Sequence, residues 1–360
     1  MKVAIIGAGN GGLAAAVELS QKGFTVSLWN RSPEIIKILR SNRGIKYTGV
    51  LGDGFVAPDV ISTDVEEVTQ SCDVLLICLP TYALGSIANL LIDVNLIDKP
   101  VILNPGHTGG ALEFSQVFRE RSVEMPPVSE FSTLTYVARQ KEPGFVNVTG
   151  AAKHIWVGKM PGGVEAQKMA LELFPNAEEA GDVLATSLAN VNMVLHPPGA
   201  ILGLSWVEST EGDFTFYVEG LTKSVGEVMN QLDHERLGVA KAFGHDLPDL
   251  FSEMKLIGTV EKDAKRQEGL VAAIQSGKAN RAIKAPDSIK HRYYQEDFYY
   301  GLMPFLELAK IAEVEVPVAT SLMTLGRTLQ AEEGEVTGRT AHKMGIDGMN
   351  RSDLLNYLKN

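Results

Sequence analysis

The chain has little cysteine, no long apolar run and no excess of positive charge. With only Cys72 and Cys78 among its 360 residues, it lacks a disulfide framework and a zinc-ligand set. No apolar run is long enough to span a bilayer, and the short apolar start leads into glycines, unlike a secretory signal. The net charge of -11 argues against a general nucleic-acid surface, because binding phosphates needs clustered lysine and arginine. We expect a cytoplasmic protein with no metal site and neither nucleic-acid nor membrane partners.

The residues that are present suit a large globular protein. Apolar residues make up 45% and charged residues 21% of the chain, and 360 residues are enough for two domains. Cys78 lies in an apolar strand pattern, so we expect a small core residue there.

The clearest pattern is a glycine-rich turn near the start. Residues 2–6 are apolar and β-branched, which predicts a buried strand; residues 13–19 predict a helix and residues 24–29 a second strand. Between the first two lie Gly7, Gly9 and Gly12. Gly7 permits the tight turn, Gly9 lets the backbone approach a pyrophosphate, and Gly12 lets the helix pack closely on the sheet. The pattern predicts dinucleotide binding; the alternative is a βαβ turn that binds no ligand.

The end of the second strand indicates which dinucleotide binds. Units that bind NAD usually place an acidic residue there, to accept a hydrogen bond from the ribose 2′-OH. This chain has Asn30-Arg31-Ser32, which removes the repulsion against a 2′-phosphate and offers it a guanidinium. We therefore predict NADP(H) in preference to NAD(H). In the alternative, Arg31 is a solvated surface charge and Ser32 only caps a helix over residues 32–40.

Strand and helix patterns then alternate up to residue 182. Further strands are predicted at residues 60–63, 73–80, 101–103 and 128–133, and helices at 64–70, 84–91, 111–120 and 164–173. This alternation predicts a doubly wound Rossmann domain over residues 1–182, with residues 44–54 as a hairpin or irregular excursion. Segments 145–149 and 154–158 suggest an antiparallel extension of the sheet. Because ligands bind at the carboxyl ends of parallel strands, the end of the strand at 73–80 lies beside the cofactor. The predicted cofactor-binding residues are Gly7, Gly9, Asn10, Gly12, Asn30, Arg31, Ser32, Leu79 and Pro80.

A second glycine-rich segment, residues 104–110, also follows a strand and opens a helix. By the same rule its polar groups could meet a nicotinamide or a substrate carboxylate. Its alternative role is a turn with helix-capping glycines.

From residue 183 onward the pattern changes. Apolar residues recur three and four positions apart, and strand patterns almost vanish, so residues 183–360 are predicted to form an all-α domain. Later helices are expected at 248–256, 268–275, 302–311, 318–329 and 352–358, the last with Ser352 as its N-cap.

Two segments of this domain carry candidate catalytic groups. His196 stands out among seven histidines because Pro197 and Pro198 should kink or end its helix there, facing the cleft between the domains. Its alternative role is a buried structural histidine. In segment 291–298, Arg292 could hold a carboxylate and Asp297 could orient a histidine. The alternative is a salt-bridged helix start.

These motifs together resemble the opine dehydrogenases, a family that includes octopine dehydrogenase. The resemblance covers nearly the whole chain. Besides the glycine turn, it rests on segments in this order: residues 103–106, 108–114, 186–192, His196-Pro197, Tyr217-Val218-Glu219-Gly220 with Ser224-Val225, 233–236, Arg292-Tyr293 with Glu296-Asp297, Gly301-Leu302 and Gly338-Arg339-Thr340.

The resemblance implies an NAD(P)-dependent oxidoreductase acting on CH–NH bonds. It would condense an amino acid with a 2-oxo acid and reduce the imine to an N-(carboxyalkyl)amino acid, an opine. His196 would be the acid/base, Asp297 its orienting carboxylate and Arg292 the carboxylate anchor. The all-α domain would have the 6-phosphogluconate-dehydrogenase-like arrangement.

Two other functions are compatible with parts of this pattern. Another NADP-dependent 2-oxoacid or hydroxyacid reductase of similar layout is disfavoured, because no lysine lies between Lys168 and Lys223, where such enzymes typically place one. A non-catalytic NADP-binding sensor would keep the glycine turn, but it would not need His196, Arg292 and Asp297, whose presence speaks against this function. We also expect a homodimer, since apolar helical faces of the second domain could bury an interface; the alternative is that these faces form only the core of the domain.

Overall fold

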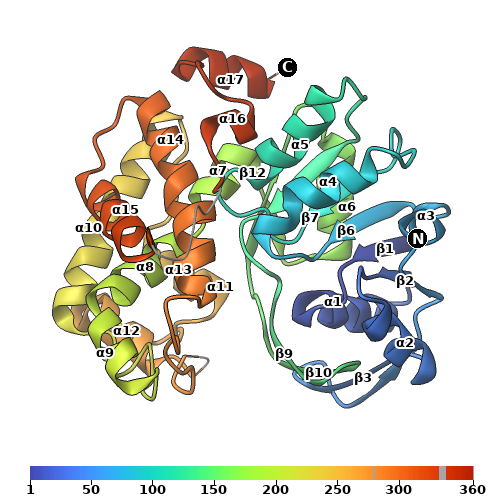
Figure 1. Ribbon diagram of the computed structural model, residues 1–360, viewed down its shortest axis with the longest axis horizontal. Coiled ribbons are helices and arrows are strands. Elements are labelled where there is room, and N and C mark those ends of the chain that lie inside the picture. Colours follow the sequence, from blue (N-terminus) through green and yellow to red (C-terminus); the bar gives the residue numbers. More distant parts are fainter. Residues whose placement is uncertain (279, 332–337, 360) are drawn as a thin grey trace. The chain divides into compact units, whose positions relative to one another are not determined.

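The computed structural model describes residues 1–278, 280–331 and 338–359. The chain forms two compact units (Figure 1). The α/β unit contains residues 1–106, 110–186 and those from 358 onward, and the helical unit contains residues 107–109 and 187–357.

The α/β unit is built on an eight-stranded sheet. Its order is β12-β11-β8-β7-β6-β1-β2-β5, and the six strands from β8 to β5 run parallel. In chain order these six follow the 3-2-1-4-5-6 arrangement of dinucleotide-binding sheets, which confirms the predicted Rossmann fold. Their bounds are β1 Lys2–Ile6, β2 Thr25–Trp29, β5 Val60–Ser62, β6 Val74–Ile77, β7 Val101–Leu103 and β8 Val128–Phe131.

Two further strands extend this sheet. β11 (Ile155–Lys159) pairs antiparallel with β8, as predicted for segment 154–158, and β12 (Ala177–Asp182) pairs parallel with β11. The sequence did not predict β12. Its residues, Ala-Glu-Glu-Ala-Gly-Asp, include three acidic side chains and no large apolar one, so they lack the apolar pattern of a strand.

A separate four-stranded sheet has the order β4-β3-β10-β9. It comprises β3 (Ile45–Gly49), β4 (Gly54–Val56), β9 (Tyr136–Glu142) and β10 (Phe145–Ala151). The prediction that segment 145–149 extends the main sheet is therefore wrong: β10 pairs parallel with β3, a partner about a hundred positions away that no local pattern specifies. The predicted hairpin at 44–54 is confirmed by the antiparallel β3–β4 pair.

Helix α1 lies between the two sheets, in contact with β1 and β2 on one side and with β9 and β10 on the other (Figure 1). Cys78 is buried in the core that these contacts form, as expected. The helices of this unit are α1 Asn10–Gln21, α2 Pro33–Ser41, α3 Val65–Thr69, η1 Thr81–Ala83, α4 Leu84–Leu91, α5 Gly110–Glu120 and α6 Val164–Leu173. Except for the short 3-10 helix η1, they lie at the positions predicted from the sequence. α7 (Val183–Leu188) contains the point where the units divide.

The second unit is helical, as predicted. Helix α8 is central to it and contacts α10, α13 and α15. No helix in the described ranges is both long and apolar enough to cross a membrane. The elements are α8 Asn192–Leu202, α9 Leu204–Thr210, α10 Lys223–Ala242, α11 Leu250–Ile257, η2 Arg266–Glu268, α12 Leu270–Ser276, α13 Arg292–Asp297, η3 Phe298–Leu302, α14 Met303–Ala312, α15 Pro317–Leu329, α16 Ala341–Met344 and α17 Arg351–Lys359.

Two local predictions in this unit need correction. Helix α8 does not end near His196 but continues through Pro197 and Pro198 to Leu202. Each proline removes one backbone hydrogen bond, but residues 193–200 are all buried, and their packing keeps the segment helical. Ser352 is not an N-cap, because α17 begins one residue earlier. The start of α17 is closed instead by reciprocal hydrogen bonds between Asn350 and Asp353.

Candidate active site

Two glycines of the β1–α1 turn are required by the fold itself. Gly7 has a φ of +116°, and a Cβ there would lie 2.6 Å from the carbonyl oxygen of Cys78. At Gly12 a Cβ would lie 1.7 Å from the carbonyl oxygen of Gly7. No side chain fits at either position, so both glycines are explained by close packing of the turn.

Gly9 is different, because a Cβ there would meet no atom of the described residues within 4 Å. It is the N-cap of α1, and no side chain in the described part of the chain caps this helix. The N–H groups of the first turn and the positive end of the helix dipole are therefore not covered by a side chain at Gly9. This arrangement fits a pyrophosphate. The side chain of Asn10 is already engaged, since its Oδ1 accepts a hydrogen bond from the N–H of Gln140 at 2.8 Å.

The three residues after β2 have different surroundings. Asn30 Oδ1 accepts a long hydrogen bond of 3.4 Å from the N–H of Ala8, in the glycine turn. Arg31 is exposed and has no ion pair or hydrogen bond to any described residue. Ser32 caps α2, accepting from the N–H of Ile35 at 3.3 Å, so the structure shows the capping role given above as its alternative.

Leu79 and Pro80 follow β6, the neighbour of β1 in the sheet. Leu79 lies against the glycine turn, since its Cδ2 is 2.8 Å from the position of a Cβ on Gly7. Pro80 is exposed and precedes η1. The predicted cofactor residues therefore lie at the carboxyl ends of β1, β2 and β6, which are adjacent strands.

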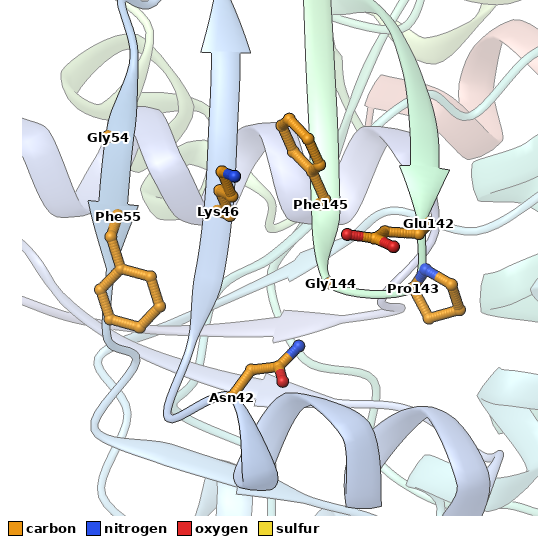
Figure 2. Close-up of a pocket in the computed structure, with 8 residues that line it drawn as sticks. All are labelled: Asn42, Lys46, Gly54, Phe55, Glu142, Pro143, Gly144 and Phe145. Atoms are coloured by element: carbon orange, nitrogen blue, oxygen red, sulfur yellow. The ribbon is translucent and has the colours of Figure 1, made fainter.

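A cavity of about 430 Å³ lies elsewhere in this unit, on the second sheet (Figure 2). None of the predicted site residues lines it, so it is not part of the candidate site. Its lining residues are Asn42, Lys46, Gly54, Phe55, Glu142, Pro143, Gly144 and Phe145.

In the helical unit, His196 of α8 and Asp297 of α13 are in direct contact. Nδ1 of His196 lies 2.7 Å from Oδ2 of Asp297, and only 4% and 3% of the two residues are exposed. An ionised carboxylate can only accept, so Nδ1 carries the proton and Nε2 is the basic nitrogen of the neutral ring. A π-helical segment, η3, follows Asp297 directly. Such segments occur frequently at functional sites.

Two tyrosines complete the surroundings of His196. Nε2 of His196 lies 2.7 Å from the hydroxyl of Tyr217, which is itself 3.4 Å from the hydroxyl of Tyr293. Burial raises the pKa of Tyr217 well above its ordinary value, so the hydroxyl stays protonated and donates a hydrogen bond to Nε2. The ring of Tyr293 stacks on the imidazole at a centroid separation of 3.8 Å.

Neither Tyr217 nor Tyr293 is predicted from the sequence to have a role at this site. Their positions in the family motifs that begin at Tyr217 and at Arg292 are the sequence feature that could have indicated one.

Arg292, the predicted carboxylate anchor, begins α13. Its Nε lies 3.1 Å from Oε2 of Glu296, and the Arg292 side chain is 52% exposed. The salt-bridged helix start given as the alternative is therefore present. About half of the Arg292 side chain therefore remains exposed beside this ion pair.

In segment 104–110, residues 107–109 belong to the helical unit and many of their polar groups are already used. The N–H of Gly109 donates to Oγ of Ser187 at 2.9 Å, and the carbonyl of Thr108 accepts from Arg339 at 2.7 Å. His107 is buried with a φ of +60°, and its burial lowers its pKa. Within the described ranges, no group of three or more His, Cys, Asp or Glu could hold a metal ion.

Comparison with known proteins agrees with this geometry. Residues 179–330 match the family model of the NAD/NADP octopine/nopaline dehydrogenase alpha-helical domain, and residues 2–105 match that of the NAD-dependent glycerol-3-phosphate dehydrogenase N-terminus. The opine dehydrogenase of Arthrobacter sp. (strain 1C) is 32% identical over 362 residues, covering 98% of this chain and 97% of that protein. The chain belongs to the opine dehydrogenase family.

Solved structures show the same fold. Octopine dehydrogenase with NADH and L-arginine aligns with a TM-score of 0.79 at 19% identity, covering 99% of this chain and 98% of the other. Yersinopine dehydrogenase with NADP+ gives a TM-score of 0.72 at 15% identity, over 99% and 97%.

As a member of this family, the chain is an NAD(P)-dependent oxidoreductase that acts on CH–NH bonds. It catalyses the reductive condensation of an amino acid with a 2-oxo acid. The comparisons give no support to the alternative reductase or sensor.

Proposed function

We propose that His196, oriented by Asp297, is the acid/base of this condensation and that Arg292 anchors the carboxylate of the 2-oxo acid. The observation that carries the proposal is the buried 2.7 Å contact between His196 Nδ1 and Asp297 Oδ2. A histidine exchanges protons near neutral pH, and a carboxylate on its other nitrogen fixes the tautomer and stabilises the imidazolium.

The reaction has two steps that need protons. The amine adds to the carbonyl to form a carbinolamine, and the C–O bond then breaks as a proton reaches the departing hydroxyl. His196 accepts a proton from the amine and returns one to that hydroxyl. When bound, NAD(P)H would supply the hydride that reduces the imine carbon, and the product would be a secondary amine.

The exposed half of Arg292 supports its role, because a guanidinium can hold a planar carboxylate through two parallel hydrogen bonds. The solved octopine dehydrogenases contain L-arginine, agmatine or pyruvate. By analogy we propose an amino acid and a small 2-oxo acid as this chain's substrates.

We propose that the cofactor binds within residues 1–182 and the substrates within residues 183–360. We further propose that NADP(H) binds in preference to NAD(H). The support is the exposed, unengaged guanidinium of Arg31 after β2, with Asn30 in place of a carboxylate. Gly9, with its open surroundings, would receive the pyrophosphate.

We also propose a cytoplasmic homodimer. The support for a dimer is a set of exposed apolar side chains in the helical unit: Leu202, Trp206, Leu325 and Leu329. Light scattering coupled to size exclusion would test it; a monomeric mass at micromolar concentration would contradict it.

The decisive experiment follows NADPH oxidation by its absorbance. Pyruvate, glyoxylate and 2-oxoglutarate are each offered alone and then with a panel of amino acids, and the series is repeated with NADH. We expect oxidation only when both an oxo acid and an amino acid are present. Oxidation with an oxo acid alone would contradict the proposal.

A further inference from the structure

Both nitrogens of the His196 ring are engaged by neighbouring side chains. Nδ1 contacts Asp297, Nε2 contacts the Tyr217 hydroxyl at 2.7 Å, and the ring of Tyr293 covers one face. Only 4% of His196 is exposed. In this arrangement a substrate cannot form a hydrogen bond with either ring nitrogen.

The Tyr217 hydroxyl is chemically suited to stand between His196 and a substrate. A phenol has one donor and can accept as well. Its donor is directed to Nε2 of His196, and its other neighbour, the Tyr293 hydroxyl, is 3.4 Å away, a weak contact. The Tyr217 ring packs against Phe216, with the two rings perpendicular and their centroids 5.1 Å apart.

We propose that Tyr217 relays the proton between His196 and the substrate, an inference that rests on the proposed function. As the carbinolamine loses water, protonated His196 gives its Nε2 proton to the Tyr217 oxygen. At the same time Tyr217 gives its own proton to the departing hydroxyl. The C–O bond breaks, the nitrogen lone pair forms C=N, and His196 ends neutral while Tyr217 regains its hydroxyl. No phenolate forms, in agreement with the burial of Tyr217.

The test is Tyr217→Phe, assayed with pyruvate and the amino acid that the wild-type protein turns over fastest. We expect kcat to fall roughly 10²-fold, the lower range for a lost acid/base group, while the Kd of NADPH changes less than twofold. The second readout is kcat in H2O–D2O mixtures. Two protons in flight give the wild type a curved dependence on deuterium fraction, and Tyr217→Phe should give a line.

Tyr294→Phe is the matched control. Tyr294 is also buried in the helical unit, and its hydroxyl donates to the Ala200 carbonyl at 2.9 Å. The variant loses one buried hydroxyl without touching His196, so it should unfold at a lower temperature and keep the curved dependence.

Four outcomes bear on the relay. A tenfold or larger loss of kcat together with loss of the curvature supports it. A wild-type kcat in Tyr217→Phe would overturn the relay but not the proposed function. This result is expected if the Tyr217 hydroxyl only covers Nε2 in the free protein and moves away from it when the substrate binds. A linear dependence of the wild-type kcat on the deuterium fraction would also overturn the relay, and this measurement does not require that any variant folds. No turnover by the wild type would overturn the proposed function as well.

Discussion

His196 and Asp297 are 101 positions apart in the sequence, yet Nδ1 and Oδ2 lie 2.7 Å apart in a buried contact. Asp297→Asn should lower kcat by roughly 10²-fold or more, because an amide can neither stabilise the imidazolium nor fix one tautomer. His196→Ala should lower turnover too, with NADPH affinity nearly unchanged. Steady-state rates and a NADPH titration measure both effects.

The control for this pair is Glu178→Gln. It removes the carboxylate beside another histidine, His154, at 3.1 Å, where the Glu178 side chain is 66% exposed. Its turnover should equal that of the wild type. A tenfold loss of cofactor binding with normal turnover in His196→Ala would refute the catalytic role.

Arg292→Lys should raise the KM for the oxo acid about tenfold, since an ammonium cannot form the bidentate pair that a guanidinium forms with a carboxylate. The effect on kcat should be smaller. The control is Arg266→Lys, which alters an exposed arginine paired with Asp249. An unchanged KM in Arg292→Lys would exclude the anchor role.

Arg31→Ala should weaken NADPH binding about tenfold or more and leave NADH binding nearly unchanged, because only NADPH carries the 2′-phosphate. Fluorescence titration with both cofactors measures the ratio. Arg121→Ala, which removes an exposed arginine after α5, should alter neither. Equal losses for both cofactors in Arg31→Ala would rule out the phosphate contact.

Gly9→Ala should separate cofactor binding from stability. Its φ of -79° suits any residue, and the added methyl meets no described atom within 4 Å, so the free energy of unfolding should change by less than about 1 kcal/mol. The methyl would stand where the pyrophosphate approaches, so NADPH affinity should fall at least about tenfold. Gly12→Ala should instead lower stability by about 3 kcal/mol or more, because its methyl collides with the Gly7 carbonyl. Wild-type affinity in Gly9→Ala would place the pyrophosphate elsewhere.

His107 should make stability depend on acid pH. Burial lowers its pKa in the folded state, whereas in the unfolded chain it titrates near 6.5. Below about pH 6.5 the unfolded state binds a proton that the folded state does not, so the free energy of unfolding falls as pH is lowered. His107→Asn, whose side chain tolerates the φ of +60°, should give a shallower fall in urea titrations between about pH 6.5 and 5. The exposed His234→Asn should keep the wild-type slope, and a slope unchanged in His107→Asn would contradict this origin.

Local patterns were enough to predict most of the α/β unit. The strand, glycine turn and helix at residues 2–21 are set by neighbouring residues, because glycine geometry and hydrophobic period act over a few positions. Helices α4 and α6 and strand β7 begin and end where the sequence predicts. Family resemblance added the pairing of His196 with Asp297.

The sequence by itself therefore determined the Rossmann core, the helical second unit and the residue types available for chemistry. Tertiary structure alone decided that β10 pairs with β3, that α8 continues through two prolines, and that Tyr217 occupies Nε2 of His196. These features depend on contacts between residues far apart in the chain or on burial from all sides. Their free energies arise only when the whole unit packs, so no local pattern encodes them.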